Sequence, residues 1–213
     1  GYNTSGYSYT STVTITGDVV FQNNIASTNG GGIYTQSTQA TIDIGPDNLS
    51  NVQFLKNISE SGHGGGGIYS YFATVKIGAG TLFDGNKTRG LSGAGMYVRK
   101  TNLTIKGTDT RPVLSQNNSA ASCGGAICII EGNTVTIEYT NFLNNWCSNF
   151  GGAIDIDNYT ATNNVIMRHC LLDGNTSNST AGGNAVEVGT GNLTIENSII
   201  RNYAAGGAHH SVN

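Results

Sequence analysis

The sequence predicts an all-β protein: a right-handed parallel β-helix, folded as a three-sided solenoid of about seven rungs of about 30 residues each. Three observations indicate this fold. Three short phrases recur in a fixed order, each phrase has the pattern of a short strand, and the composition is rich in turn-forming residues. We interpret residues 1–213 as a single β-helix segment without a second domain, and we expect it to be part of a longer repeat protein.

The first phrase consists of an aromatic or aliphatic residue, two further residues and an asparagine. We expect these asparagines at one corner of the coil, where each side-chain amide bonds its copies above and below in a structural ladder. Such a ladder pairs polar groups that a tight corner would otherwise leave unsatisfied. The ladder asparagines are Asn24, Asn57, Asn86, Asn117, Asn145, Asn175 and Asn202. The first residues of the phrase are expected to form an inward column: Phe21, Phe54, Phe83, Leu114, Phe142, Leu172 and Ile199.

The second phrase ends in an aliphatic residue after glycine or alanine, and the third alternates apolar and polar residues. Short runs rich in β-branched residues and bounded by Gly, Asn, Ser or Asp are typical of strands. Three such strands per unit fit one turn of a coil in which each strand pairs in parallel with its copy in the next turn. The second phrase ends at Ile33, Ile68, Met96, Ile127, Ile154 and Val186. The third covers residues 12–15, 41–44, 74–77, 102–105, 134–137, 164–167 and 192–195.

The charge and hydropathy of the chain limit its partners. A formal net charge of −3 is too small to indicate a nucleic-acid or anionic-membrane partner. No apolar run is long enough to cross a bilayer, so we expect no membrane insertion by this segment. An uncapped β-helix exposes open strand edges, so we expect further β-helix rungs or stacked subunits at both ends, and self-association of the isolated segment.

The phrases GGAI (residues 124–127 and 151–154) and FxxN resemble the hallmark repeats of the chlamydial polymorphic membrane proteins, and GGGI and GAGM are close variants. That family consists of autotransporter-type surface proteins whose passenger is a right-handed β-helix acting in adhesion. The resemblance implies a secreted, cell-surface location and a structural or adhesive role, as a rigid rod within a larger surface protein or filament. It also implies a host or matrix protein, or a glycan, as a partner.

One column of the predicted coil is expected on its outer face. The residue after the last residue of the second phrase is Tyr34, Tyr69, Tyr97, Cys128, Asp155, Glu187 and His210 in successive rungs. Three stacked tyrosines followed by two acids would form a surface strip that binds a sugar or a protein, because exposed aromatic rings suit both. The alternative is that the tyrosines only pack against one another on the same face of a sheet.

Asp155, Asp157 and Glu187 form the acidic cluster of the predicted coil. Such carboxylates could bind Ca²⁺, or act as the catalytic pair of a pectin-lyase-like, carbohydrate-active enzyme on the same fold. Against catalysis, no Arg or Lys is expected on the neighbouring strands of that face, and the rungs vary little in length. We therefore expect no enzyme activity and no cofactor, with Ca²⁺ as the alternative.

Two kinds of covalent modification are suggested by the sequence. Cys123 and Cys147 both lie between the FxxN and GGAI phrases, in adjacent rungs, so we expect a disulfide between them and an oxidising compartment. Ten Asn-x-Ser/Thr sequons occur along the chain. The glycosylation candidates among them are Asn3, Asn48, Asn102, Asn158, Asn178 and Asn192.

Overall fold

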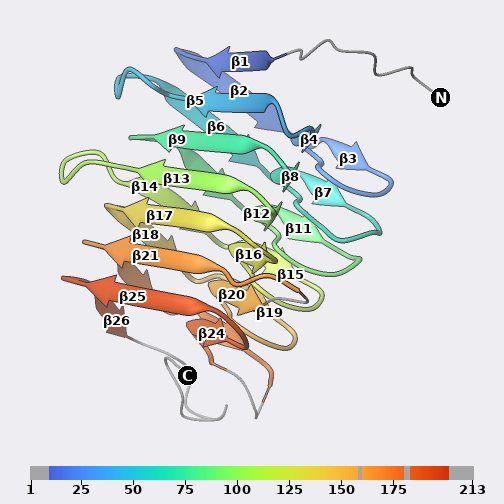
Figure 1. The fold of residues 1–213 in the computed structure, drawn as a ribbon, viewed down its shortest axis with the longest axis vertical. Coiled ribbons are helices and arrows are strands. Elements are labelled where there is room, and N and C mark those ends of the chain that lie inside the picture. The colour runs from blue at the N-terminus through green and yellow to red at the C-terminus, as the bar shows by residue number, and fades with distance from the viewer. Residues whose placement is uncertain (1–9, 158–159, 180–182, 202–213) are drawn as a thin grey trace.

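The computed structural model describes residues 10–157, 160–179 and 183–201. Over these ranges the chain is a parallel β-solenoid, and successive rungs stack from the N-terminal to the C-terminal end (Figure 1). Its strands form four parallel sheets, which we call A to D in the order in which one rung visits them. No helix in the described ranges is long and apolar enough to cross a membrane. The all-β, parallel solenoid predicted from the sequence is confirmed by these sheets.

Sheets A and B correspond to the third and first phrases of the sequence. Each has seven strands among the described residues, and each strand pairs with its copy one rung away. Sheet A comprises β1 (Ser11–Ile15), β5 (Ala40–Ile44), β9 (Thr74–Gly78), β13 (Asn102–Lys106), β17 (Thr134–Glu138), β21 (Asn164–Arg168) and β25 (Asn192–Glu196). Sheet B comprises β2 (Asp18–Gln22), β6 (Asn51–Leu55), β10 (Leu82–Asp84), β14 (Val113–Gln116), β18 (Thr140–Leu143), β22 (Leu171–Asp173) and β26 (Ile199–Arg201).

Sheet C is not indicated by the sequence. Its strands are two residues long and follow directly after each corner asparagine. They are β3 (Ile25–Ala26), β7 (Ile58–Ser59), β11 (Lys87–Thr88), β15 (Ser119–Ala120), β19 (Trp146–Cys147) and β23 (Thr176–Ser177). Sheet D corresponds to the second phrase. Its strands are β4 (Ile33–Gln36), β8 (Ile68–Tyr71), β12 (Met96–Arg99), β16 (Ile127–Ile130), β20 (Ile154–Asp157) and β24 (Val186–Val188).

The predicted inward columns make up the core. In sheet A, Ile44 pairs with Ile77, and both are buried. In sheet B the rings of Phe21, Phe54 and Phe83 stack with centroids 4.8 and 4.7 Å apart, close to the spacing of neighbouring strands. Stacking like upon like therefore fills the interior of these three rungs without a change of side-chain volume.

The sheet B column is displaced by one residue from the prediction in two rungs. Phe83 pairs with Ser115 and not with Leu114, and Leu172 pairs with Ile200 and not with Ile199. Ile199 is 56% exposed on the outer side of its strand. A strand has a side-chain period of two, so an error of one residue moves a side chain to the opposite face.

The asparagine ladder is present, with one correction. Each amide Nδ2 donates to Oδ1 of the next asparagine at 2.8 to 3.0 Å, through Asn24, Asn57, Asn86, Asn118, Asn145 and Asn175. The fourth member is thus Asn118 and not Asn117. Asn117 has a left-handed φ of 55° and donates from the exposed side to Asp84. Asn202 lies outside the described residues.

A second, shorter asparagine ladder runs between sheets D and A. Asn133 Nδ2 donates to Asn163 Oδ1 at 2.6 Å, and the Thr101 N–H donates to Asn133 Oδ1 at 2.8 Å. All three residues are buried. Two corners of the coil therefore satisfy their polar groups in the same way.

Candidate functional site

The three tyrosines of the predicted strip stack as expected, but most of the strip is covered. Tyr34 pairs with Tyr69 and Tyr69 with Tyr97, and their ring centroids lie 5.1 and 5.3 Å apart. Tyr34 is 52% exposed, whereas Tyr69 is 4% and Tyr97 3% exposed. The prediction of a continuous surface track is therefore wrong, and packing on the same face accounts for Tyr69 and Tyr97.

The cover comes from the loops that join sheet C to sheet D. In the loops before β4, β8, β12, β16 and β20, the residue three positions before the strand is a glycine with a left-handed φ, for example Gly65 (71°), Gly93 (64°) and Gly124 (60°). A Cβ atom at Gly124 would lie 2.9 Å from the Cα atom of Cys128, so the chain folds back tightly against its own strand. The His63 ring, from such a loop, stacks on Tyr97 at 5.6 Å. The loops thus bury the outward residues of sheet D.

The same column continues into a buried thiol and a buried carboxyl group. Cys128 pairs with Asp155 in the next rung, and Cys128 Sγ lies 3.6 Å from Asp155 Oδ2. Asp155 is 5% exposed. Its burial, together with the nearby carboxylates of Asp157 and Glu187, raises the pKa of Asp155 to about 7. This carboxyl group therefore gains or loses its proton near neutral pH.

The acidic residues considered as an alternative Ca²⁺ site are not grouped as metal ligands. No group of three or more His, Cys, Asp or Glu side chains in the described ranges is arranged to hold a metal ion. The three carboxylates have separate partners within the protein: Asp157 Oδ1 accepts from the Thr190 hydroxyl at 3.2 Å, and Glu187 accepts from the Gly183 N–H. Carboxylates that already bind different donors do not converge on one point, as a Ca²⁺ site requires.

The predicted Cys123–Cys147 disulfide is not formed either, and all four cysteines are free thiols. The predicted disulfide requires Cys123 and Cys147 to lie at equivalent positions of adjacent rungs, where they would face each other. Cys147 instead pairs with Ala120, three positions before Cys123, and its thiol donates to the Phe150 carbonyl at 3.1 Å. Burial raises the pKa of the Cys147 thiol to about 12. The offset lies within the loop between the phrases, where the sequence has no repeated pattern that would set the register.

The sequon asparagines fall into two groups in the structure. Among the glycosylation candidates, Asn48, Asn102, Asn178 and Asn192 are exposed. Asn3 and Asn158 lie outside the described residues. Ladder residues that also belong to sequons are fully or nearly fully buried, as for Asn57, Asn86 and Asn175. Their amides are bonded into the corner, so they are closed to modification in the folded chain.

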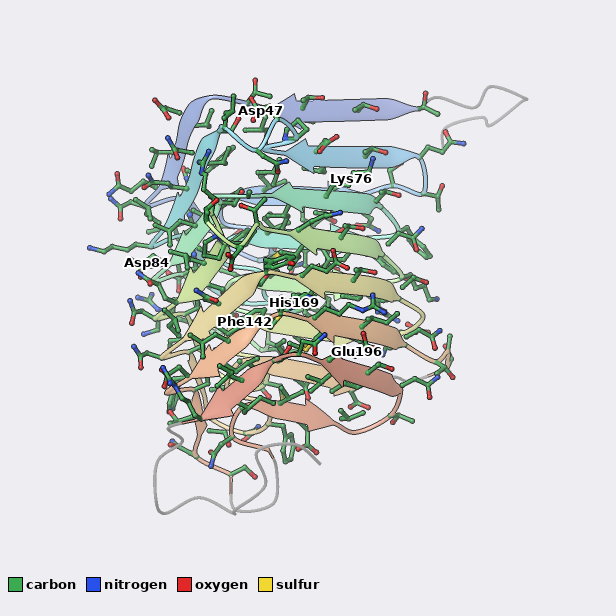
Figure 2. All side chains as sticks on the ribbon, turned by 90° about the vertical axis from the view of Figure 1, so that its left-hand side faces the viewer. Asp47, Lys76, Asp84, Phe142, His169 and Glu196 are labelled. Carbon is green, nitrogen blue, oxygen red and sulfur yellow. The ribbon has the colours of Figure 1, made fainter. Side chains whose placement is uncertain are left out.

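A pocket that the sequence does not indicate lies on the outer face of sheet A. Two connections from sheet A to sheet B are longer than the others of this kind; residues 45–50 and 107–112 project from the same edge of the stack (Figure 1). Arg111 links them, since its guanidinium donates to the carbonyls of Asn48 and Ser50 at 2.6 and 2.8 Å. Figure 2 shows Lys76 on this side of the molecule, with Asp47 in the first connection.

The pocket has a volume of about 380 Å³ and opens to solvent. Its strand residues include the charged or polar Asp43, Lys76, Thr104 and Lys106, together with Ile77 and Gly78. The two connections close it at one end. A cavity of this size, with polar groups that converge on it, is suited to a small ligand. The only signal in the sequence is the extra length of these two rungs between their third and first phrases.

Comparison with known families gives one match. The Chlamydia polymorphic membrane protein repeat matches residues 18–36 and 112–130. The two matched segments are equivalent in the structure, because each contains one strand of sheet B, one of sheet C and one of sheet D: β2 to β4 in the first and β14 to β16 in the second. No curated protein and no solved structure matches the chain.

Proposed function

We propose that this chain, a coil with repeats of the chlamydial polymorphic membrane protein type, is a cell-surface β-helix that acts as a rigid, adhesive rod within a larger surface protein or filament. The observation that carries the proposal is the position of the two matched repeats. They cover the same three strands of two rungs, and the rungs between them have the same strands and register. The repeat of the family is therefore also the structural repeat of this chain.

The packing supports a mechanical role for the coil. Each inner strand is hydrogen-bonded to a copy on both sides, and the asparagine ladder adds side-chain hydrogen bonds along one corner. Outside, ion pairs join successive rungs, as between Arg168 and Glu196 at 2.5 Å and between Arg201 and Asp173 at 3.1 Å. Such a stack resists bending because every contact is repeated in the next rung.

The proposed partners include further rungs or stacked subunits. In the first described rung the inward residue Val13 is 48% exposed, whereas its copies in the next two rungs, Ile42 and Val75, are 6% and 0% exposed. Light scattering of the isolated chain tests this part of the proposal. Concentration-dependent association is expected, and a stable monomer at high concentration would refute it.

Location and adhesion are tested separately. Antibodies raised against the folded chain should label intact cells of the source organism, and labelling that needs permeabilised cells would refute a surface location. Beads coated with the folded chain should attach to cultured host cells, and soluble folded chain should compete. Equal attachment of beads coated with heat-unfolded chain would count against a role of the folded rod.

A second candidate function is binding of an acidic saccharide in the pocket on sheet A. Lys76 and Lys106 line it together with the hydroxyl groups of Thr104 and Thr108, and ammonium and hydroxyl groups suit the carboxylate or sulfate and the hydroxyls of such a sugar. The double variant Lys76→Ala/Lys106→Ala should weaken binding of uronic-acid or sulfated oligosaccharides at least 10-fold on a glycan array and in titration.

Lys56→Ala is the matched control for that experiment, because Lys56 is exposed near the asparagine corner and does not line the pocket. It should bind like the parent chain. A parent chain that binds no acidic saccharide, or an equal loss of binding in the control, would rule out this second function and leave the rod proposal untouched.

A further inference from the structure

We infer that Cys123 and Cys128 form a redox-active dithiol, whose reversible disulfide ties the loop before β16 to the outer face of sheet D, and that Asp155 accepts the proton of the Cys128 thiol. This inference goes beyond the proposed rod function and does not depend on it. It also differs from the pairing expected from the sequence, which joins Cys123 to Cys147.

The backbone brings Cys123 close to Cys128. Cys128 lies on β16 with its side chain outward, in the covered column between Tyr97 and Asp155. Gly124 follows Cys123 with a φ of 60°, and a Cβ atom at Gly124 would lie 2.9 Å from the Cys128 Cα atom. The chain thus reverses within a few residues, as a disulfide across so short a span requires.

Ser92 of the preceding rung gives independent evidence that the two thiols are close. Its side chain lies against the thiols of both Cys123 and Cys128. Both thiols therefore lie near the same hydroxyl group, and the Cys128 thiol also interacts with that of Cys123. Rotation of the Cys123 side chain from its present partner, the Ser122 hydroxyl at 3.2 Å, is the movement needed.

The two thiols differ in access and in their neighbours. Cys123 is partly exposed, whereas Cys128 is 1% exposed. An oxidant therefore meets Cys123 first, and Cys128 is placed to attack the product. Burial raises the pKa of both thiols, and the nearby Asp155 adds to the effect. A buried thiol of this kind reacts only if a base next to it takes the proton.

Asp155 is that base. Its Oδ2 atom lies 3.6 Å from Cys128 Sγ. The groups that act on it are Cys128 from β16, Asp157 on its own strand and Glu187 from β24. Together with burial, the two carboxylates raise the pKa of Asp155 to about 7. Its carboxylate is therefore far more basic than an exposed one, and no ion pair holds it among the described residues.

The reaction uses a small-molecule disulfide as the oxidant. The Cys123 thiol loses its proton to water, and its thiolate attacks one sulfur atom of the small disulfide. The S–S bond of the small molecule breaks, a mixed disulfide forms, and the small thiolate that leaves takes up a proton from water. Cys128 then gives its proton to Asp155, and its sulfur attacks Cys123 Sγ and releases the second small thiol, which takes up the proton. Two protein thiols are oxidised to one disulfide, and one small disulfide is reduced to two thiols.

The other two cysteines are not positioned to take part in this reaction. The Cys147 thiol is held by the Phe150 carbonyl in a small cluster with Ala94 and Ala120. The Cys170 thiol donates to the Arg168 carbonyl at 3.2 Å, away from the loops over sheet D. We expect both to stay reduced when Cys123 and Cys128 are oxidised.

Peptide mapping tests the pairing. The folded chain is equilibrated with reduced and oxidised glutathione, quenched with acid, alkylated and cleaved after glutamate. Cleavage at Glu131 and Glu138 leaves Cys123 and Cys128 on one peptide and Cys147 on another. The first peptide should be two hydrogens lighter and unalkylated, while the peptide of residues 139–187, which holds both Cys147 and Cys170, should carry two alkyl groups. A Cys123–Cys147 link, or no disulfide under oxidising glutathione, would overturn the inference.

Three variants separate the roles. Cys128→Ser should leave Cys123 as a mixed disulfide with glutathione, and Cys147→Ser should oxidise like the parent chain. Asp155→Asn should close the disulfide at least 10-fold more slowly at pH 7.5 and lose the rise in rate that the parent shows as pH passes about 7. An unchanged rate and pH profile in a folded Asp155→Asn chain would overturn the role of Asp155.

Discussion

At the scale of single residues, the corner asparagines carry more hydrogen bonds than any other repeated side chain of the described coil. The buried Asn118 Nδ2 donates to the Phe83 carbonyl and to Asn145 Oδ1 at 3.1 and 2.9 Å. Its Oδ1 accepts from both the backbone N–H and the Nδ2 of Asn86. One amide therefore satisfies polar groups of three successive rungs, which a shorter or apolar side chain cannot do.

Asn118→Ala should destabilise the chain by about 3–5 kcal/mol, because each buried polar group left without a partner costs about 1–3 kcal/mol. The measurement is the midpoint of urea unfolding followed by circular dichroism. Asn117→Gly is the control next to it in sequence, since glycine accepts the left-handed φ of 55°. It should cost less than about 1 kcal/mol. A larger loss of stability for Asn117→Gly than for Asn118→Ala would show that Asn117, the residue that the sequence pattern selects, is the corner asparagine.

Asp155 makes stability depend on pH. Its pKa is raised from 3.8 to about 7 in the folded chain, so between these values the folded state holds a proton that the unfolded state has lost. The free energy of unfolding should therefore be highest below pH about 4, fall as pH rises to about 7, and then level off, with a total change of a few kcal/mol from this group. Asp155→Asn should remove this part of the slope and be more stable than the parent at pH 8. Asp18→Asn, at an exposed position, should keep the slope.

The choice between adjacent residues is the weak point of the sequence-based prediction. In Gln116-Asn117-Asn118 both asparagines are candidates for the corner, and the spacing of the phrase selects the first. The rungs ending at Asn24 and Asn145 carry the same doubled asparagine, and there the second one is the corner. Comparison with those rungs corrects the position. The raised pKa of Asp155 could not be predicted, because it depends on a loop that covers the strand.

At the scale of elements, the loops between sheets C and D are shaped by one glycine per rung. A Cβ atom at Gly93 would lie 2.1 Å from the Met96 carbonyl oxygen, and one at Gly124 would lie 2.3 Å from that of Ile127. Both glycines also have a left-handed φ. These positions are closed to other residues for two reasons: the backbone conformation, and contact with backbone atoms that cannot move aside.

Gly93→Ala should destabilise the chain by more than about 2 kcal/mol, since the strain of a left-handed alanine adds to a backbone clash. Gly85→Ala is the matched control. Gly85 has the same φ of 64°, but only the flexible Lys56 side chain lies near its Cβ position, at 3.4 Å. Its cost should be about 1 kcal/mol. Equal losses in urea unfolding would show that φ alone, and not the clash, determines the effect.

Elements with a distinct pattern were predictable, and those defined by packing were not. The strands of sheets A and D follow apolar–polar alternation, as in Thr134–Glu138, and their predicted register is correct. Sheet C has strands such as Lys87–Thr88, too short to show any alternation. Tyr69 and Tyr97 lie in the predicted column, but their burial depends on loops contributed from elsewhere in the rung.

At the scale of the whole molecule, the rung is the unit of stability. Hydrogen bonds along the described coil join a residue to its copy about one rung away, as for Asn118 and Asn145, which are 27 residues apart in sequence. Asn117 and Asn144 precede them with nearly the same left-handed φ, 55° and 53°. Removal of residues 118–144 therefore joins two equivalent corners and leaves no distortion of the backbone at the junction.

The chain without residues 118–144 should fold, keep its β-sheet circular dichroism and unfold cooperatively at a modestly lower urea concentration, because one set of nearest-neighbour contacts is lost. Small-angle X-ray scattering should show a length reduced by one strand spacing, about 4.8 Å.

Removal of residues 118–130 is the control. It takes out one corner and the strands β15 and β16 but leaves β17 and β18, so the rungs below can no longer stack in register on those above. That chain should lose its sheet structure. Unfolding of both chains to the same extent would mean that stability is shared over the whole coil and does not reside in its rungs.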